Sequence, residues 1–237
     1  MIIYFSGTGN SESVARGLLK EGERIADWTE EISVAADERV GFVFPVYCGD
    51  VPKGLIEKIR AVRIDAEYVF AVATAGGNAG HSLNSISYLM KEKGIDLDYG
   101  TCLKMPDSCI LFPTSAAETS RLLDTESARV NEVAAELDLK KIVCFAPKKP
   151  FPFQTKAMWF FFRKIVGRIS EKSVDEKCMM CLKCVECCPV NNIEVRDGKI
   201  VFKGKCEDCY RCIQSCPERA IRFGSLTVTD KTHYIHP

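Results

Sequence analysis

The chain has 237 residues, of which 46% are hydrophobic and 27% charged, which favours one large globular domain with a small second one. Its 32 Lys and Arg residues balance 32 Asp and Glu residues, so composition gives no reason to expect nucleic acid or a membrane as partner. No stretch approaches the roughly 20 apolar residues of a membrane span, and no signal peptide is visible, so a cytoplasmic protein is expected.

Residues 1–147 alternate short β-branched or aromatic runs with amphipathic stretches, which predicts an α/β domain with a parallel sheet covered on both faces. The expected strands are 1–5, 23–27, 39–45, 68–74 and 99–104, and the expected helices are 11–21, 52–62, 81–93 and 116–138. In such open sheets ligands bind beyond the carboxyl ends of the strands. The candidate binding loops are therefore 6–11, 45–52 and 74–80.

The loop after the first expected strand is rich in glycine and hydroxyl groups, and it reads Ser6-Gly7-Thr8-Gly9-Asn10-Ser11. Because it opens a helix, its backbone N–H groups and the helix N-terminus point at one place, where a phosphate fits. The hydroxyl groups can donate hydrogen bonds, so no Lys or Arg is needed. A purely structural turn is the alternative, and a nucleoside triphosphate loop does not fit, because no Lys follows the last glycine.

This loop resembles the FMN phosphate loop of flavodoxins, T/S-x-T-G-x-T, with Ser11 in place of the last threonine. The resemblance implies that Tyr47 in the second loop stacks on the flavin ring, although a tyrosine packed at a strand end is an equal alternative. The third loop has no aromatic residue, so one face of the ring would be open, or covered by residues 105–108 or by the second domain. The residues implied at the FMN site are Ser6, Gly7, Thr8, Gly9, Asn10, Ser11, Pro45, Val46, Tyr47, Cys48, Gly49, Thr74, Ala75, Gly76 and Gly77.

Residues 148–173 form an expected connector, with a basic segment followed by a short aromatic helix. We expect it to pack between the domains, and contact with a membrane surface is the less favoured alternative. Residues 1–140 carry a net charge of −8 and residues 141–176 a net charge of +5, so the connector is expected to attract the first domain. The basic residues expected to do so are Lys148, Lys149, Lys156, Arg163, Lys164 and Arg168. Trp159 and Phe162 are expected to bury apolar surface between the domains.

Residues 174–237 contain a repeat with a period of 28, and each half carries C-x2-C-x2-C-x3-C-P. Three tandem cysteines followed by Cys-Pro are typical of two-cluster 4Fe-4S proteins, in which the fourth cysteine ligates the other cluster. Two four-cysteine zinc sites are the less favoured alternative. The spacing assigns one cluster to Cys178, Cys181, Cys184 and Cys216, and the other to Cys206, Cys209, Cys212 and Cys188.

Two further features of this segment lead to predictions. Cys187 lacks the three-residue spacing and the following proline, so it is not expected to be a ligand. Asp197-Gly198 lies between two β-branched runs, which predicts a hairpin.

The whole chain resembles the flavodoxin–ferredoxin fusion proteins of anaerobic bacteria and archaea. The resemblance implies a flavodoxin-like, doubly wound five-stranded parallel sheet followed by a small α+β ferredoxin-like domain. It also implies FMN, two 4Fe-4S clusters, and electron transfer between a redox-protein donor and acceptor that the sequence does not identify.

Two other functions remain open at this stage. An exposed flavin face would allow direct reduction of a quinone, a nitro compound or a free flavin. A redox sensor is the second alternative, and it would use the clusters or the cysteines outside the repeat, Cys48, Cys102, Cys109 and Cys144. No acid–base constellation is visible, since His81, His233 and His236 lie far in sequence from any cysteine or carboxylate motif.

Overall fold

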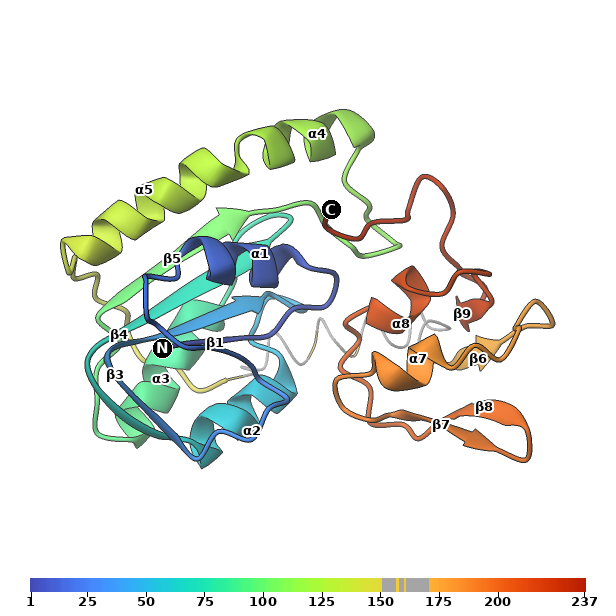
Figure 1. Ribbon diagram of the computed structural model, residues 1–237, viewed down its shortest axis with the longest axis horizontal. Coiled ribbons are helices and arrows are strands. Elements are labelled where there is room, and N and C mark those ends of the chain that lie inside the picture. The colour runs from blue at the N-terminus through green and yellow to red at the C-terminus, as the bar shows by residue number, and fades with distance from the viewer. Residues whose placement is uncertain (151–156, 158–159, 161–170) are drawn as a thin grey trace.

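The computed structural model describes residues 1–150, 157, 160 and 171–237, which form two lobes (Figure 1). The first lobe contains the N-terminus and the large sheet, and the smaller second lobe contains the cysteine repeat. The connector residues Lys156, Trp159, Phe162, Arg163, Lys164 and Arg168 lie outside the described residues. Within the described part, no helix has the length and apolar character needed to cross a membrane.

The first lobe is built on a five-stranded parallel sheet with the strand order β2-β1-β3-β4-β5, which is the flavodoxin-like order. Its strands are β1 (Ile2–Tyr4), β2 (Ile25–Asp27), β3 (Val34–Pro45), β4 (Arg63–Ala75) and β5 (Tyr99–Lys104). The predicted α/β class and the five strands are confirmed. Strands β3 and β4 start earlier than expected, because residues 34–37 pair with residues 63–66.

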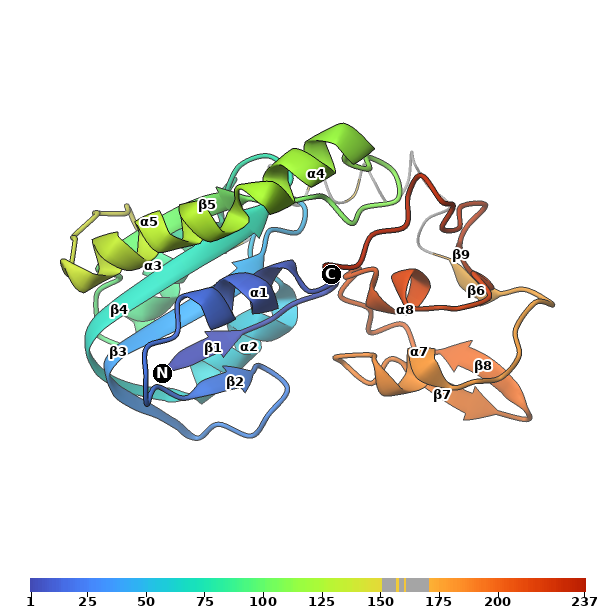
Figure 2. The ribbon, with the colours of Figure 1, turned by 45° about the horizontal axis from the view of Figure 1, so that its top comes forward.

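Helices cover both faces of this sheet, as the doubly wound pattern predicts (Figure 2). They are α1 (Asn10–Gly17), α2 (Lys53–Ala61), α3 (Ser82–Glu92), α4 (Ala116–Asp124) and α5 (Glu126–Asp138). Apolar residues of α2 and α3 pack on one face, and those of α1 and α5 pack on the other. The single helix expected over 116–138 is divided at Thr125, whose hydroxyl group donates to the Arg121 carbonyl oxygen at 2.9 Å.

The second lobe consists of short elements. They are β6 (Lys172–Val174), α7 (Lys183–Glu186), β7 (Ile193–Arg196), β8 (Lys199–Phe202), α8 (Arg211–Gln214) and β9 (Ile221–Phe223). The predicted hairpin is confirmed: β7 and β8 are antiparallel, and Asp197 and Gly198 both have positive φ. Strand β6 pairs with β9, so Lys172 and Ser173 belong to this lobe although the sequence placed them in the connector.

The 28-residue repeat is also a repeat of backbone conformation. Helix α8 follows α7 at this spacing, and so do three pairs of residues with positive φ. The pairs are Met180 and Asp208, Leu182 and Tyr210, and Asn191 and Arg219. Residues with side chains seldom adopt positive φ, so the two cysteine segments share a specific path of the chain.

Candidate cofactor-binding site

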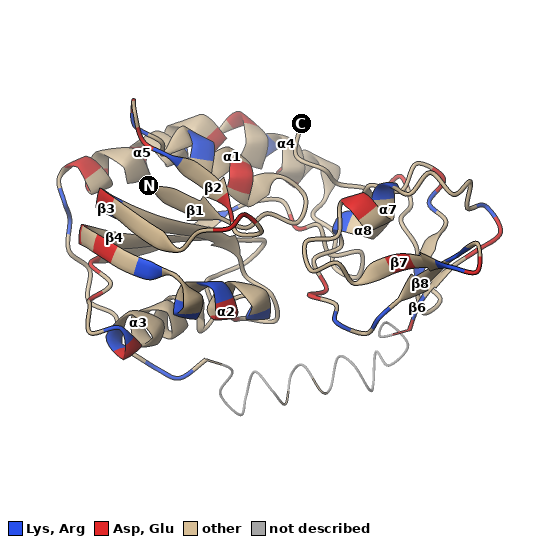
Figure 3. Cartoon of the chain, turned by 60° about the horizontal axis from the view of Figure 1, so that its bottom comes forward, with Lys and Arg blue, Asp and Glu red and all other residues tan. Residues whose placement is uncertain are grey.

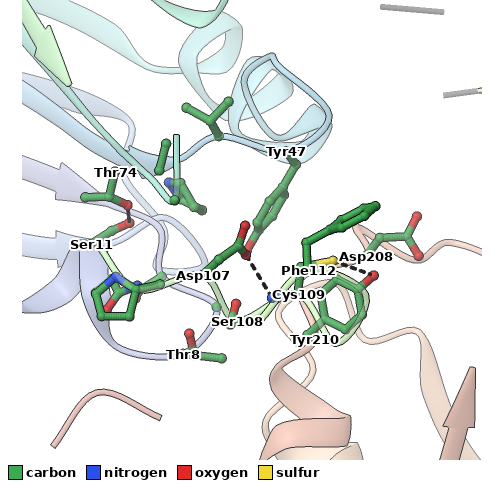
Figure 4. A pocket seen from close by; sticks show the side chains of 18 of the residues that line it. Thr8, Ser11, Tyr47, Thr74, Asp107, Ser108, Cys109, Phe112, Asp208 and Tyr210 are labelled. Atoms are coloured by element: carbon green, nitrogen blue, oxygen red, sulfur yellow. Dashed lines mark hydrogen bonds between the residues drawn. The ribbon is translucent and has the colours of Figure 1, made fainter. Parts of the chain in front are cut away.

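A cavity of about 270 Å³ lies between the two lobes at the carboxyl ends of β1, β3 and β4 (Figure 4). It brings together the three loops that the sequence singled out. The expected residues that line it are Ser6, Gly7, Thr8, Asn10, Ser11, Pro45, Val46, Tyr47, Cys48, Thr74, Ala75 and Gly76. The expected residues that are not part of this lining are Gly9, Gly49 and Gly77.

A hydrogen bond between two hydroxyl groups joins the first loop to the third, and another bond stabilises the turn within the first loop. The Ser11 and Thr74 hydroxyl oxygens lie 2.8 Å apart, and the Gly9 N–H donates to Ser6 Oγ at 3.0 Å. Gly9 has a φ of 104°, a conformation that a residue with a side chain rarely adopts. The loop therefore turns sharply at Gly9 and starts α1 next to the cavity.

The start of α1 has the properties of an anion site. Gly9 has no side chain to cap the first amide groups of the helix, and the helix dipole favours negative charge at this end. The side chains of Ser6, Thr8 and Ser11 are buried beside it. None of the described residues that line the cavity is Lys or Arg, so backbone and hydroxyl groups would have to bind a phosphate.

Tyr47 lies in the cavity lining, with its ring edge-on to Phe5 at a centroid distance of 6.0 Å. Burial raises the pKa of Tyr47 well above its usual value, with the nearby Cys209 thiol adding to the effect, so the phenol stays neutral at ordinary pH. Its expected stacking on a flavin ring stays a prediction.

The remaining wall of the cavity comes from residues that sequence reasoning had not assigned to it. The loop after β5 contributes Pro106, Asp107, Ser108, Cys109, Leu111 and Phe112, and the second lobe contributes Glu207, Asp208 and Tyr210. The two segments considered from the sequence for the open side of the ring, residues 105–108 and the second domain, therefore both contribute to this wall. Met105 is the exception, because it is buried against the face of the sheet that α1 and α5 cover. Tyr210 lies within a cysteine motif, and nothing in that motif signals a role in another cavity.

Asp107 and Cys109 connect the two sides of this wall (Figure 4). The Cys109 N–H donates to Asp107 Oδ1 at 2.8 Å, and Cys109 Sγ lies 3.6 Å from the Tyr210 hydroxyl group. Burial raises the pKa of both Asp107 and Cys109. Burial thus disfavours the charged form of both side chains in this wall.

The eight repeat cysteines line two further, small cavities in the second lobe. The first-set cavity is lined by Cys178, Cys181, Cys184 and Cys216. The second-set cavity is lined by Cys188, Cys206, Cys209 and Cys212. These are the two groupings that the spacing predicts, with the fourth cysteine exchanged between the halves.

Backbone N–H groups donate to cysteine sulfur atoms at equivalent places in the two halves. The Asn192 N–H lies 3.2 Å from Cys188 Sγ, and the Ala220 N–H lies 3.3 Å from Cys216 Sγ. Within the described residues, no three or more His, Cys, Asp or Glu side chains are arranged to hold a single metal ion.

Cys187 differs from its neighbour Cys188 in its surroundings. It lines neither cysteine cavity, and its sulfur lies 3.8 Å from the Cys184 carbonyl oxygen. Burial raises the pKa of Cys187 to about 11. It is therefore a protonated, packed thiol at neutral pH.

His236 lies beside a carboxylate in the fold, although none is near it in sequence. Its Nε2 lies 2.7 Å from Glu126 Oε2, and Ser13 donates to the other oxygen of that carboxylate at 2.6 Å. The hydrogen bond to Glu126 raises the pKa of His236, with burial opposing it. Burial alone would raise the pKa of Glu126, but the bonds from His236 and Ser13 hold it below its usual value.

This pair predicts a pH dependence of stability. Because folding raises the pKa of His236, this side chain stabilises the fold fully at pH values below its unfolded-state pKa of about 6.5. That stabilisation is lost as the pH rises through its folded-state pKa. Because folding lowers the pKa of Glu126, this side chain stabilises the fold fully at pH values above its unfolded-state pKa of about 4.3. That stabilisation is lost as the pH falls through its folded-state pKa. The difference in melting temperature between the native chain and Glu126→Gln should therefore be largest between about pH 5 and 6.5, and it should become smaller as the pH rises through the raised pKa of His236.

Glu92→Gln is the matched control, because Glu92 pairs with Arg60 at an exposed site and no histidine is involved. Its effect on the melting temperature should be small and constant over the same pH range. If Glu126→Gln behaves in the same way, the His236 pair does not carry the pH dependence.

Comparison with known proteins gives no family. No family model matches the chain, and no curated protein matches it. Among solved structures, an FMN-dependent NADH-azoreductase from Bacillus anthracis in complex with FMN is 11% identical, with a TM-score of 0.39, over 57% of this chain and 98% of that one. The Trp repressor binding protein from Bacillus subtilis is 10% identical, with a TM-score of 0.34, over 55% and 97%.

Rubredoxin oxygen:oxidoreductase from the anaerobe Desulfovibrio gigas is 16% identical, with a TM-score of 0.35, over 59% of this chain and 36% of that one. None of these three structures reaches a TM-score of 0.5. The fold class is established by the strand order of this chain itself, and the function is argued from its own cavities.

Proposed function

We propose that this chain is an electron-transfer protein that binds FMN in the cavity between the lobes and a 4Fe-4S cluster in each cysteine cavity. The observation that carries the proposal is a shared wall. Glu207 and Tyr210 line both the cavity between the lobes and the second-set cavity. The two candidate cofactor sites are therefore adjacent, as a relay requires.

The residues present fit FMN in the following way. The loop of residues 6–11 would bind the phosphate through hydroxyl and backbone donors, as its position at the start of α1 favours. Residues 45–48 and 74–76 would surround the ring, and Tyr47, Phe112 and Tyr210 are the aromatic side chains in the lining that could contact it. A bound flavin accepts one or two electrons, and 4Fe-4S clusters exchange one at a time.

The cysteine cavities fit two clusters by their donor sets. Each cavity gathers four sulfur ligands, three from one half of the repeat and one from the other. Each receives a backbone N–H bond on the sulfur of the exchanged cysteine. These features support the ligand assignment, which stays a proposal until metal is measured.

The placement of the two cysteine sets suggests the order of the relay. Cys209 and Cys212 of the second set are buried, on the side of the lobe that faces the flavin cavity. In the first set Cys181 is exposed, and Met179, which directly follows Cys178, is 63% exposed. We therefore place the second set next to the flavin and the first set where a redox-protein donor or acceptor meets the chain.

A reductase of a small acceptor is the second candidate function. The observation in its favour is that Phe112, which lines the cavity, is 61% exposed, so an apolar molecule from solvent can reach this wall. Sustained turnover of the purified chain with a quinone or a nitroaromatic acceptor would support this function. Rapid reduction of a partner iron–sulfur protein without such turnover would support the carrier.

The cofactor content of the purified chain tests both functions. Anaerobic purification should give one FMN and about eight iron and eight sulfide per chain. Zinc in place of iron would overturn the cluster assignment and would instead favour a four-cysteine zinc site in each cysteine cavity. Iron and sulfide without flavin would remove the first lobe from the relay.

A further inference from the structure

We infer that the second lobe holds the phosphate loop in its binding conformation, so that FMN binding and occupancy of the second cysteine set strengthen each other. This inference rests on the proposed function and adds a regulation of the same site. The reason is that each residue from Ser6 to Asn10 contacts the second lobe or the tail that follows it, as described below.

The first contact is made by Arg211, at the start of α8. Its guanidinium group donates to the carbonyl oxygens of Ser6 and Gly7, the latter at 3.1 Å. It also donates to the Cys187 carbonyl oxygen at 3.3 Å. One side chain thus joins the phosphate loop to both halves of the cysteine repeat.

The second contact is the close approach of the backbone at Gly7. A Cβ atom on residue 7 would lie 2.6 Å from the Cys209 carbonyl oxygen and 2.7 Å from the Tyr47 hydroxyl group. Real Cβ contacts are not this short, so only glycine allows the second-set segment to lie against the loop. The position of Cys209 therefore bears directly on the path of the loop.

The third contact is the C-terminal tail. The His236 N–H donates to the Thr8 carbonyl oxygen at 2.7 Å, and its side chain packs over Gly9. The Tyr234 hydroxyl group donates to Asn10 Oδ1 at 2.5 Å. Asn10 in turn donates to the Pro106 carbonyl oxygen at 2.8 Å, so the tail helps fix the cavity wall as well.

The tail is itself anchored on α8, between two cysteines of the repeat. Gln214 Oε1 accepts from the Tyr234 N–H at 3.0 Å, and Gln214 Nε2 donates to the carbonyl oxygens of Thr232 and Ser108 at 3.0 and 2.9 Å. Gln214 is buried. Displacement of α8 would therefore displace the tail from the phosphate loop.

The loop that contains Tyr47 is also fixed by the segment of the second lobe that carries the second-set cysteines. The Glu207 carboxylate accepts from the N–H groups of Lys53 and Gly54, at 3.0 and 3.1 Å, at the start of α2. This helix directly follows the loop that contains Tyr47. Glu207 is next to Cys206, so this bond also depends on the path of the second-set segment.

These contacts come largely from residues 207–214, which lie between and beside cysteines of the second set. Metal binding supplies folding free energy in small lobes whose ligands are held by little else. Loss of the second cluster should therefore loosen this segment and raise the free energy of the binding-competent loop. Linkage requires the reciprocal effect, in which bound FMN slows loss of iron from the second set.

The two halves of the repeat supply a matched pair of variants. Cys206→Ser removes a second-set ligand, and Cys178→Ser removes its equivalent 28 residues earlier in the first set. FMN affinity is measured anaerobically by flavin fluorescence on the full chain, with iron counted in each sample. We expect Cys206→Ser to weaken FMN binding by about 5- to 150-fold and Cys178→Ser to have a clearly smaller effect.

The outcomes separate this inference from the proposed function. If the native chain with full iron does not bind FMN, the proposed function fails. If it binds FMN and Cys206→Ser binds FMN as tightly, the coupling is overturned. An equal loss in both variants also overturns it, because the effect would not come from the second-set segment.

A milder variant tests the same coupling without touching a ligand. Tyr234→Phe removes only the hydroxyl group that reaches Asn10, and Tyr68→Phe removes a comparable bond to the Lys141 carbonyl oxygen inside the first lobe. With iron content unchanged, Tyr234→Phe should weaken FMN binding and reduce the protection that FMN gives against an iron chelator. If iron release from the native chain is independent of FMN, the coupling is contradicted.

Discussion

Cys188→Ser should remove or convert one of the two clusters, whereas Cys187→Ser should leave both intact. The two cysteines are adjacent in sequence, but only Cys188 lines the second-set cavity and receives a backbone N–H bond on its sulfur. Loss of a ligand thiolate should lower the iron content by up to about half if the cluster is lost. Iron analysis and EPR spectra of the reduced variants measure the effect.

Cys187→Ser is the control in this experiment, because it places a hydroxyl group at a packed position that faces no cysteine cavity. Iron loss in Cys187→Ser with full iron in Cys188→Ser would show that the ligand register is displaced by one residue. The exchange of Cys188 and Cys216 between the two halves would then also be wrong.

FMN should bind much more tightly than riboflavin, and Thr8→Val should reduce that preference. Thr8 is buried in the loop at the start of α1, and its hydroxyl group is a candidate donor to the phosphate. A hydrogen bond to a charged acceptor contributes about 1.5 to 3 kcal/mol, so the variant should weaken FMN binding by about 10- to 150-fold. Fluorescence titrations with both flavins measure it.

Thr29→Val is the control, since Thr29 is exposed and its hydroxyl group bonds Asp27. It should leave both affinities unchanged. Equal affinity of the native chain for FMN and riboflavin would mean that the loop does not bind a phosphate.

The sheet and its binding edge could be predicted because they depend on local patterns. Alternating apolar runs identified the five strands, and the three loops beyond their carboxyl ends do meet at one cavity. The turn at Asp197-Gly198 was predictable for the same reason, since its two residues set the backbone conformation directly. The division of the last helix at Thr125 was not, because the residues on both sides of it continue the helical pattern.

Contacts between distant parts of the chain could not be predicted. Tyr210 and Asp107 meet at the cavity although about a hundred residues separate them, and the His236–Glu126 pair spans 110 residues. Gly7 shows the same limit. From the sequence it is one of two glycines in a candidate phosphate loop. In the structure the positive φ belongs to Gly9, and Gly7 is needed for the approach of Cys209.

The charge argument made from the sequence did not identify the hydrogen bonds that join the two lobes. Charged residues of both signs lie on both lobes (Figure 3). Arg211, Glu207 and Gln214 of the second lobe bond to the first lobe. The expected role of the connector stays a prediction, because most of its basic and aromatic residues lie outside the described part of the chain.

The proposed relay requires that the flavin and the clusters exchange electrons within one chain. Rapid anaerobic mixing of the cofactor-loaded chain with dithionite tests this, while flavin and cluster absorbance are followed separately. We expect a phase in which the two cofactors equilibrate at a rate that does not change over about a tenfold range of protein concentration. A rate proportional to protein concentration would contradict it, because electrons would then pass only between molecules.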